Sequence, residues 1–169
     1  GSVCSAGFLT GTSVALTATR DPGWTFQDWS GDVESTQNPL TLTVEHDTAI
    51  TATFSQDDYP LDVYIVGQGA VTKEPDPDVY HYGDVATLTA TADRGWTFQS
   101  WSGDVDSTNN PLELVVEANT TITTTFSQDE YTLDVTTIGE GDVDVEPEQV
   151  TYIYGDVVTL TAIAEPAWS

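Results

Sequence analysis

Two stretches of the chain carry carboxylate and amide side chains at alternate positions, and oxygen atoms of this kind are the ligands that Ca2+ prefers. The six side chains are Asp32, Glu34 and Asn38 in the first stretch, and Asp104, Asp106 and Asn110 in the second. Calcium takes about six to eight oxygen ligands, and each stretch supplies part of such a set. The same residue types also form ordinary turns. The pattern therefore predicts either calcium-binding loops or solvated turns, and Ca2+ is the only cofactor that it suggests.

Aromatic residues form a second candidate site. Residues 23–33 and residues 95–105 each contain the motif Gly-Trp-Thr-Phe-Gln-x-Trp-Ser-Gly-Asp-Val. Exposed indole rings stack on sugars, but in a repeat this small the same rings are much of the bulk available for a core. Burial is therefore the favoured interpretation. If the chain binds glycans, Trp29 and Trp101 are the candidates for stacking on them.

The direction of the second tryptophan depends on the regularity of its strand. Alternation of side chains places Trp96 and Phe98 on one face of the strand and Trp101 on the other. A bulge near Gln99 and Ser100 would return Trp101 to the first face. Without that bulge, we expect one tryptophan of the motif to be partly exposed.

Nucleophiles and bases do not recur together in the sequence. His46 and His81 occupy non-equivalent positions in the motif order, and Cys4 is the single cysteine. Nucleophilic catalysis needs a nucleophile within reach of a base, so the sequence predicts no catalytic residues. A carboxylate pair of the glycosidase type stays open because acidic residues are abundant. Cys4 is interpreted as incidental or as a link between chains.

A constant interval of 72 residues organises the sequence, and it separates Trp24, Trp96 and Trp168. The interval divides the chain into residues 1–58, 59–130 and 131–169, which we call repeats 1, 2 and 3. Only repeat 2 contains every motif. Repeat 1 lacks the opening strands, and repeat 3 lacks the closing ones. We therefore expect tandem copies of one small module.

Short runs of alternating apolar and polar residues predict strands, and no stretch has helical periodicity. Residues 61–66 and 70–72 flank Gly67-Gln68-Gly69, a pattern typical of a hairpin. Two prolines within residues 74–78 predict an edge or a loop. We expect an all-β chain of small antiparallel modules without substantial helix, each with about five or six short strands paired in sequential order.

The charge of the chain excludes several partners. Twenty-eight acidic residues against three basic ones give a net charge of −25, which repels nucleic acid and anionic membrane surfaces. No apolar run approaches the roughly twenty residues of a membrane-spanning helix. We expect neither nucleic-acid binding nor direct membrane insertion.

Six short motifs follow one another in a fixed order. They are Tyr-x-Leu-x-Val, Gly-x-Gly-x-Val, Tyr-x-Tyr-Gly-Asp-Val-x-Thr-Leu-Thr-Ala, Gly-Trp-x-Phe-x-x-Trp-Ser-Gly, Asn-Pro-Leu and Thr-x-Thr-x-x-Phe. The order resembles the divergent InlB B-repeat domains of bacterial and archaeal surface proteins. The resemblance covers the whole chain, although residues 2–12 depart from the pattern. It implies an extracellular, cell-surface module with a compact β-grasp-like sheet and no catalytic residues.

The resemblance also implies a non-enzymatic role as a stalk, spacer or adhesin. The partners would be neighbouring repeats, copies of the chain itself, surface glycans, or proteins of a host or cell surface. Asn119, in the sequence Asn119-Thr120-Thr121, is an acceptor for N-glycosylation and fits secretion.

Two alternative functions stay open. Residues 131–144 correspond to the strands that repeat 1 lacks, so one chain would complete another by strand exchange and build a filament or sheath. The incomplete first and last repeats are explained more simply if the chain is a segment of a longer array of repeats. The second alternative is a glycan-binding module that uses an exposed tryptophan.

Overall fold

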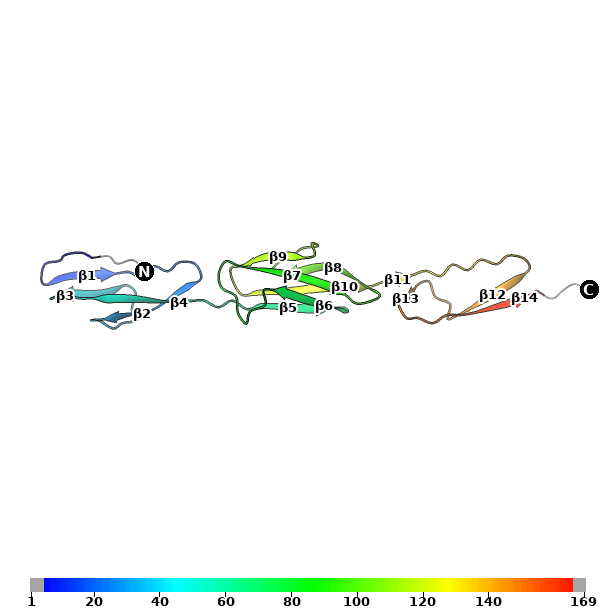
Figure 1. Ribbon diagram of the computed structural model, residues 1–169, viewed down its shortest axis with the longest axis horizontal. Helices are drawn as coiled ribbons and strands as arrows, with labels where there is room; N and C mark the ends of the chain where they lie inside the picture. The colour runs from blue at the N-terminus through cyan, green and yellow to red at the C-terminus, as the bar shows by residue number, and fades with distance from the viewer. Residues whose placement is uncertain (1–4, 166–169) are drawn as a thin grey trace, which may run out of the picture. The chain divides into compact units, whose positions relative to one another are not determined.

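The computed structural model describes residues 5–165, and no helix occurs among them. The all-β class predicted from the sequence is confirmed, with many short strands in small sheets (Figure 1). Cys4 and Trp168 lie outside the described residues. The chain divides into two compact units. One contains residues 5–60, 77–85 and 115–119, and the other contains residues 61–76, 86–114 and 120–165.

Repeat 1 forms two two-stranded sheets in the first unit. The strands are β1 (Thr12–Leu16), β2 (Trp24–Gly31), β3 (Leu40–Val44) and β4 (Ile50–Gln56). β1 pairs antiparallel with β3, and β2 pairs antiparallel with β4. The sequential pairing predicted from the sequence is therefore wrong for repeat 1. Successive strands alternate between two sheets, so that each sheet can cover one apolar side.

The strands of repeat 2 form two sheets of three, ordered β5-β10-β8 and β6-β7-β9. They are β5 (Leu61–Val66), β6 (Gly69–Glu74), β7 (Asp84–Ala92), β8 (Trp96–Gly103), β9 (Leu112–Val116) and β10 (Thr120–Gln128). This arrangement replaces the single β-grasp-like sheet that the resemblance implied. β7 and β9 run across the division between the two units. The proline-containing segment after β6 is a loop, as predicted.

The hairpin predicted at Gly67-Gln68-Gly69 is wrong, because β5 and β6 lie in different sheets. β5 pairs in parallel with β10, and β6 pairs with β7. Gly67 has a φ of +93°, and a Cβ added there would meet the carbonyl oxygen of Phe126 on β10. The glycine turn therefore passes close against β10 and moves the chain from one sheet to the other.

A bulge in β8 decides where the second tryptophan points. Ser100 lies opposite Thr125, while Phe98 lies opposite Phe126, so Gln99 is the extra residue. The bulge returns Trp101 to the face of Phe98, and the two ring centroids are 5.4 Å apart. β2 has the same irregularity, between Phe26 and Asp28. The bulged alternative is therefore the one observed.

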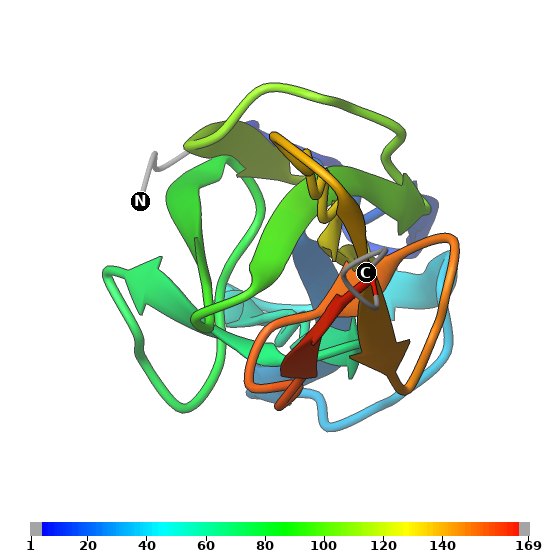
Figure 2. The same cartoon turned by 90° about the vertical axis from the view of Figure 1, so that its right-hand side faces the viewer.

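Four further strands of the second unit lie in repeat 3 or at its boundary with repeat 2. They are β11 (Glu130–Tyr131), β12 (Gly141–Glu146), β13 (Tyr152–Ile153) and β14 (Thr159–Ala164). β11 pairs with β13, and β12 and β14 lie side by side as an antiparallel pair (Figure 2). Within residues 5–165 no helix is long and apolar enough to cross a membrane.

Candidate functional site

The structure buries the two tryptophans that were the glycan-stacking candidates. Trp101 is 1% exposed and Trp29 is 7% exposed, whereas Trp24 is 40% exposed. The indole nitrogen of Trp101 donates to the carbonyl oxygen of Asn109 at 2.9 Å. Because the bulge turns these rings inward, Trp29 and Trp101 offer no open face to a sugar. One tryptophan of the first motif is partly exposed, but it is Trp24 and not the glycan candidate Trp29.

The side chains predicted to bind calcium instead hold backbone groups. The amide of Asn110 accepts from the nitrogen of Ala90 at 2.9 Å and donates to the oxygen of the same residue at 2.7 Å. The carboxylate of Asp104 accepts from the nitrogen of Thr121 at 2.7 Å. Asp106 is exposed. Such bonds fix a loop between strands, as polar turn residues commonly do.

The first loop repeats these contacts. Asn38 binds both backbone groups of Ala18, and Asp32 accepts from the nitrogen of Ala49. Glu34 is exposed. Across residues 5–165 no group of three or more His, Cys, Asp or Glu side chains is placed to hold a metal ion. The structure thus favours the turn interpretation of both loops.

Asn119 is exposed in the loop that leads from β9 to β10. These strands belong to different sheets, so the loop connects two sheets and is not a hairpin turn. Its exposure leaves the acceptor accessible, and glycosylation of Asn119 stays a prediction.

A further set of recurring contacts lies where one repeat meets the next. We call the contacts among residues 21–25, 57–59 and 80–84 the first junction. Those among residues 93–97, 129–131 and 152–156 are the second junction. Each junction lies inside one compact unit, the first in the unit that begins the chain and the second in the other.

An aspartate ties the chain at each junction to the preceding repeat. At the first junction the backbone nitrogen of Asp57 donates to the oxygen of Gly23 at 2.8 Å, and its carboxylate accepts from the Thr25 hydroxyl at 2.6 Å. At the second junction Asp129 makes the same two bonds, to Gly95 and Thr97, at 2.8 and 2.6 Å. The connection between repeats is thus hydrogen-bonded at its first residue.

Tyrosines complete the connection. Tyr59 and Tyr80 exchange two backbone hydrogen bonds, of 2.8 and 3.2 Å. Tyr131 and Tyr152 form the equivalent antiparallel pair. Two short β-bridges therefore hold the start of each following repeat against its own later turn.

A glycine in each junction receives a tyrosine of the next repeat. Gly23 and Gly95 have φ angles of +75° and +78°, and we call them the docking glycines. A Cβ added to Gly23 would overlap the Cβ of Tyr82, and one added to Gly95 would overlap that of Tyr154. Only glycine combines this backbone conformation with so close an approach.

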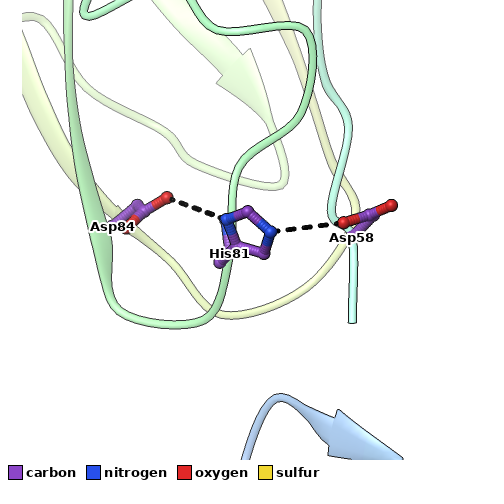
Figure 3. A network of polar contacts seen from close by, with 3 residues as sticks. All are labelled: Asp58, His81 and Asp84. Carbon is purple, nitrogen blue, oxygen red and sulfur yellow. Dashed lines mark hydrogen bonds and ion pairs between the residues drawn. The ribbon is translucent and has the colours of Figure 1, made fainter. Parts of the chain in front are cut away.

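The first junction contains a histidine between two carboxylates (Figure 3). Nε2 of His81 lies 3.3 Å from Asp58, and Nδ1 lies 3.8 Å from Asp84. Asp84 also accepts from the backbone nitrogen of His81 at 2.8 Å. At the second junction Ile153 occupies the histidine's place, and its backbone nitrogen donates to Asp156 at 2.9 Å. The turn recurs, but the contact of a histidine with two carboxylates does not.

The second junction has a different addition. The guanidinium of Arg94 donates to the hydroxyl of Tyr154 at 2.9 Å and lies 5.6 Å from the centroid of its ring. At the first junction Pro22 occupies the arginine's place. Each junction thus adds one cationic or titratable side chain to a common framework.

This framework belongs to a known kind of repeat. The sequence profile of the divergent InlB B-repeat domain matches residues 1–58 and residues 59–130. The chain belongs to this family. The family is a surface repeat domain, so the chain is a tandem surface-type repeat. Comparisons with curated proteins and with solved structures gave no match.

Sequence reasoning missed the junctions of these B-repeats, although a signal for them was present. Tyr59 and Tyr131 keep the interval of 72 residues, as do Tyr82 and Tyr154. The interval defines the copies, but by itself it does not show which residues of neighbouring copies meet. The trio of Asp58, His81 and Asp84 brings one imidazole and two carboxylates together at the first junction only.

Proposed function

We propose that this B-repeat segment is a non-enzymatic spacer, or stalk, of a protein displayed at a cell surface. The observation that carries the proposal is the recurrence of one junction at an interval of 72 residues. A flexible connection would contain exposed, unpaired backbone rich in glycine and serine. Here Asp57 and Asp129 begin connections that are hydrogen-bonded to both neighbours.

The contacts at each junction support a stiff connection. At the first junction three backbone bonds and one charge-assisted bond hold Asp57 and Tyr59, and each such bond contributes about 0.5–3 kcal/mol net. The docking glycine adds close packing against a tyrosine. A segment whose copies meet through a fixed set of contacts is suited to setting a distance between two other domains.

The acidity of the chain fits a solvated spacer. A net charge of −25 keeps the segment soluble and discourages collapse onto neighbouring copies. An extracellular location follows from the spacer role and stays part of the proposal. The filament alternative stays a prediction, and the buried rings of Trp29 and Trp101 give no support to the glycan-binding alternative.

Small-angle X-ray scattering tests the proposal with variants that loosen the junctions. Replacing both docking glycines, Gly23→Ala and Gly95→Ala, should broaden the distance distribution and give the signature of flexibly joined parts. Gly83→Ala is the matched control. Gly83 has a φ of +88°, but a Cβ there meets nothing within 4 Å.

The control should keep the scattering profile of the unaltered chain, because it adds backbone strain without blocking a tyrosine. A flexible profile for the unaltered chain would contradict the spacer proposal. So would a double glycine variant that scatters like the control.

A further inference from the structure

A patch of apolar side chains at the end of β5 has no role in the repeat framework. Tyr64, Ile65 and Val66 are 61%, 46% and 53% exposed. Successive side chains of a strand point to opposite faces, so the patch spans both faces of β5 at its end. Scattered exposed apolar residues are common, but three in a row on one strand mark a candidate contact surface.

β5 is also an edge strand. In the sheet order β5-β10-β8 its one neighbour among the described residues is β10. Its other side presents backbone N–H and C=O groups that accept an added strand. Proteins commonly protect such edges with charged side chains or proline, yet the last three residues of β5 include neither.

Packing of the following turn against β10 fixes the position of this edge. A Cβ on Gly67 would meet the carbonyl oxygen of Phe126, and a Cβ on Gly69 would meet the ring of Phe126 at 2.6 Å. The turn after β5 is therefore packed against β10 at both glycines. A rigid edge loses little conformational entropy when a partner strand is added.

Tyr64 and Ile65 are not part of the repeated sequence pattern. At the equivalent positions repeat 3 has Thr136 and Thr137 in place of Tyr64 and Ile65. Repeat 2 thus presents an apolar edge that the repeat pattern itself does not dictate. A partner that binds repeat 2 alone would account for this difference.

The surrounding charge indicates the chemistry of that partner. Residues 57–78 contain six carboxylates and one basic residue, Lys73, which is paired with Asp76 at 2.9 Å. An acidic surface attracts cationic partners and speeds their association. A second copy of the chain would bring another net charge of −25 to the same place, which disfavours self-association.

We propose that the free edge of β5 is a docking site for a basic, extended peptide segment of another protein. The segment adds a strand to the sheet through backbone hydrogen bonds, places apolar side chains on Tyr64, Ile65 and Val66, and directs lysine or arginine toward the nearby carboxylates. The role goes beyond spacing, because it makes repeat 2 an attachment point along the segment.

The probe is a nine-residue peptide of alternating lysine, valine and threonine, added to the whole isotope-labelled chain and followed by amide NMR. We expect saturable shifts at residues 61–66. A peptide N-methylated at every second residue cannot form the ladder along one edge and should bind at least tenfold more weakly. A peptide with glutamate in place of lysine should not bind.

The matched protein variant is Tyr64→Thr with Ile65→Thr, which copies repeat 3. Both side chains are exposed, so its thermal unfolding should match that of the unaltered chain, while peptide binding should fall at least tenfold. Equal binding by this variant would overturn the proposal in favour of general charge attraction. Absence of saturable shifts, or dimerisation of the chain through residues 61–66 in sedimentation, would overturn it as well. None of these outcomes alters the scattering test of the spacer.

Discussion

The two junctions share a backbone framework but differ in the side chain that completes each. Both have an aspartate bonded to the docking glycine and a pair of bridged tyrosines. The first adds His81, between two carboxylates, and the second adds Arg94, against Tyr154. The shared contacts involve backbone groups and closely packed atoms, whereas the differing ones are charged and solvent-accessible. We therefore expect the shared framework to contribute more stability than either addition.

The largest effect should come from Trp101→Ala, because repeat 2 supplies residues to both junctions. Truncating a large buried aromatic side chain costs about 3–5 kcal/mol, and the change also leaves the carbonyl oxygen of Asn109 without its indole donor. Denaturant unfolding followed by circular dichroism should show this loss, with both junctions disordered in amide NMR.

Trp24→Ala is the control for Trp101→Ala. The Trp24 ring is 40% exposed, so its removal should cost much less. If both variants lose a similar free energy of unfolding, burial of the ring by the bulge does not determine how much each tryptophan contributes to stability.

The second-largest effect is expected from a substitution that destabilises one junction and leaves the other unchanged. Gly95→Ala should open the second junction and leave the first intact. The left-handed φ costs about 1–2 kcal/mol for a residue with a Cβ, and overlap with Tyr154 adds about 1–3 kcal/mol. Amide exchange should accelerate at Asp129 and stay unchanged at Asp57.

Gly155→Ala is the control for the cost of placing a residue with a Cβ at a left-handed φ. Gly155 has a φ of +94° and open space around a built Cβ. If Gly95→Ala and Gly155→Ala destabilise the chain equally, the packing of tyrosine against the docking glycine contributes nothing.

The sequence predicts local structure well and long-range pairing poorly. Alternating residues and turn signals predict the strands, because both depend on local backbone preferences. Pairing depends on residues far apart in the chain. The chain turns at Gly67 and Gly69 as a hairpin would, but β10, more than fifty residues later, takes the place beside β5. A local pattern contains no information about that partner.

For the candidate site residues, too, the sequence shows the residue types but not their contact partners. The sequence restricted Trp101 to two directions, and the extra Gln99 selects the inward one. Oxygen-rich loops at Asp104 and Asn110 suggested calcium because their residue types also suit a metal, but their backbone partners, Thr121 and Ala90, become visible only in the fold. The docking glycines belong to a repeated sequence motif. Their close contact with a tyrosine of the next repeat is visible only in the fold.

A smaller effect should follow from Arg94→Ala at the second junction. An exposed cation over a tyrosine ring contributes about 0.5–1 kcal/mol, so the loss should be within this range and confined to that junction. Arg94→Lys keeps the charge and loses the planar donor, and should recover only part of the stability. Complete recovery by lysine would show that charge alone acts there. Exchange at Asp129 and at Ile153 is the measurement.

The smallest effect should come from His81→Ile, which copies residue 153 into the first junction. Asp58 and Asp84 have side chains 63% and 47% exposed, so water and salt screen their attraction to His81, and pairs of this kind contribute at most about 1 kcal/mol. The backbone turn survives, because Ile153 makes the same bond to Asp156. Exchange at Tyr59 should rise slightly at low salt and match the unaltered chain at high salt. A loss larger than that of Gly95→Ala would reverse the order expected from the comparison, and would place the strength of the first junction in its ion pair.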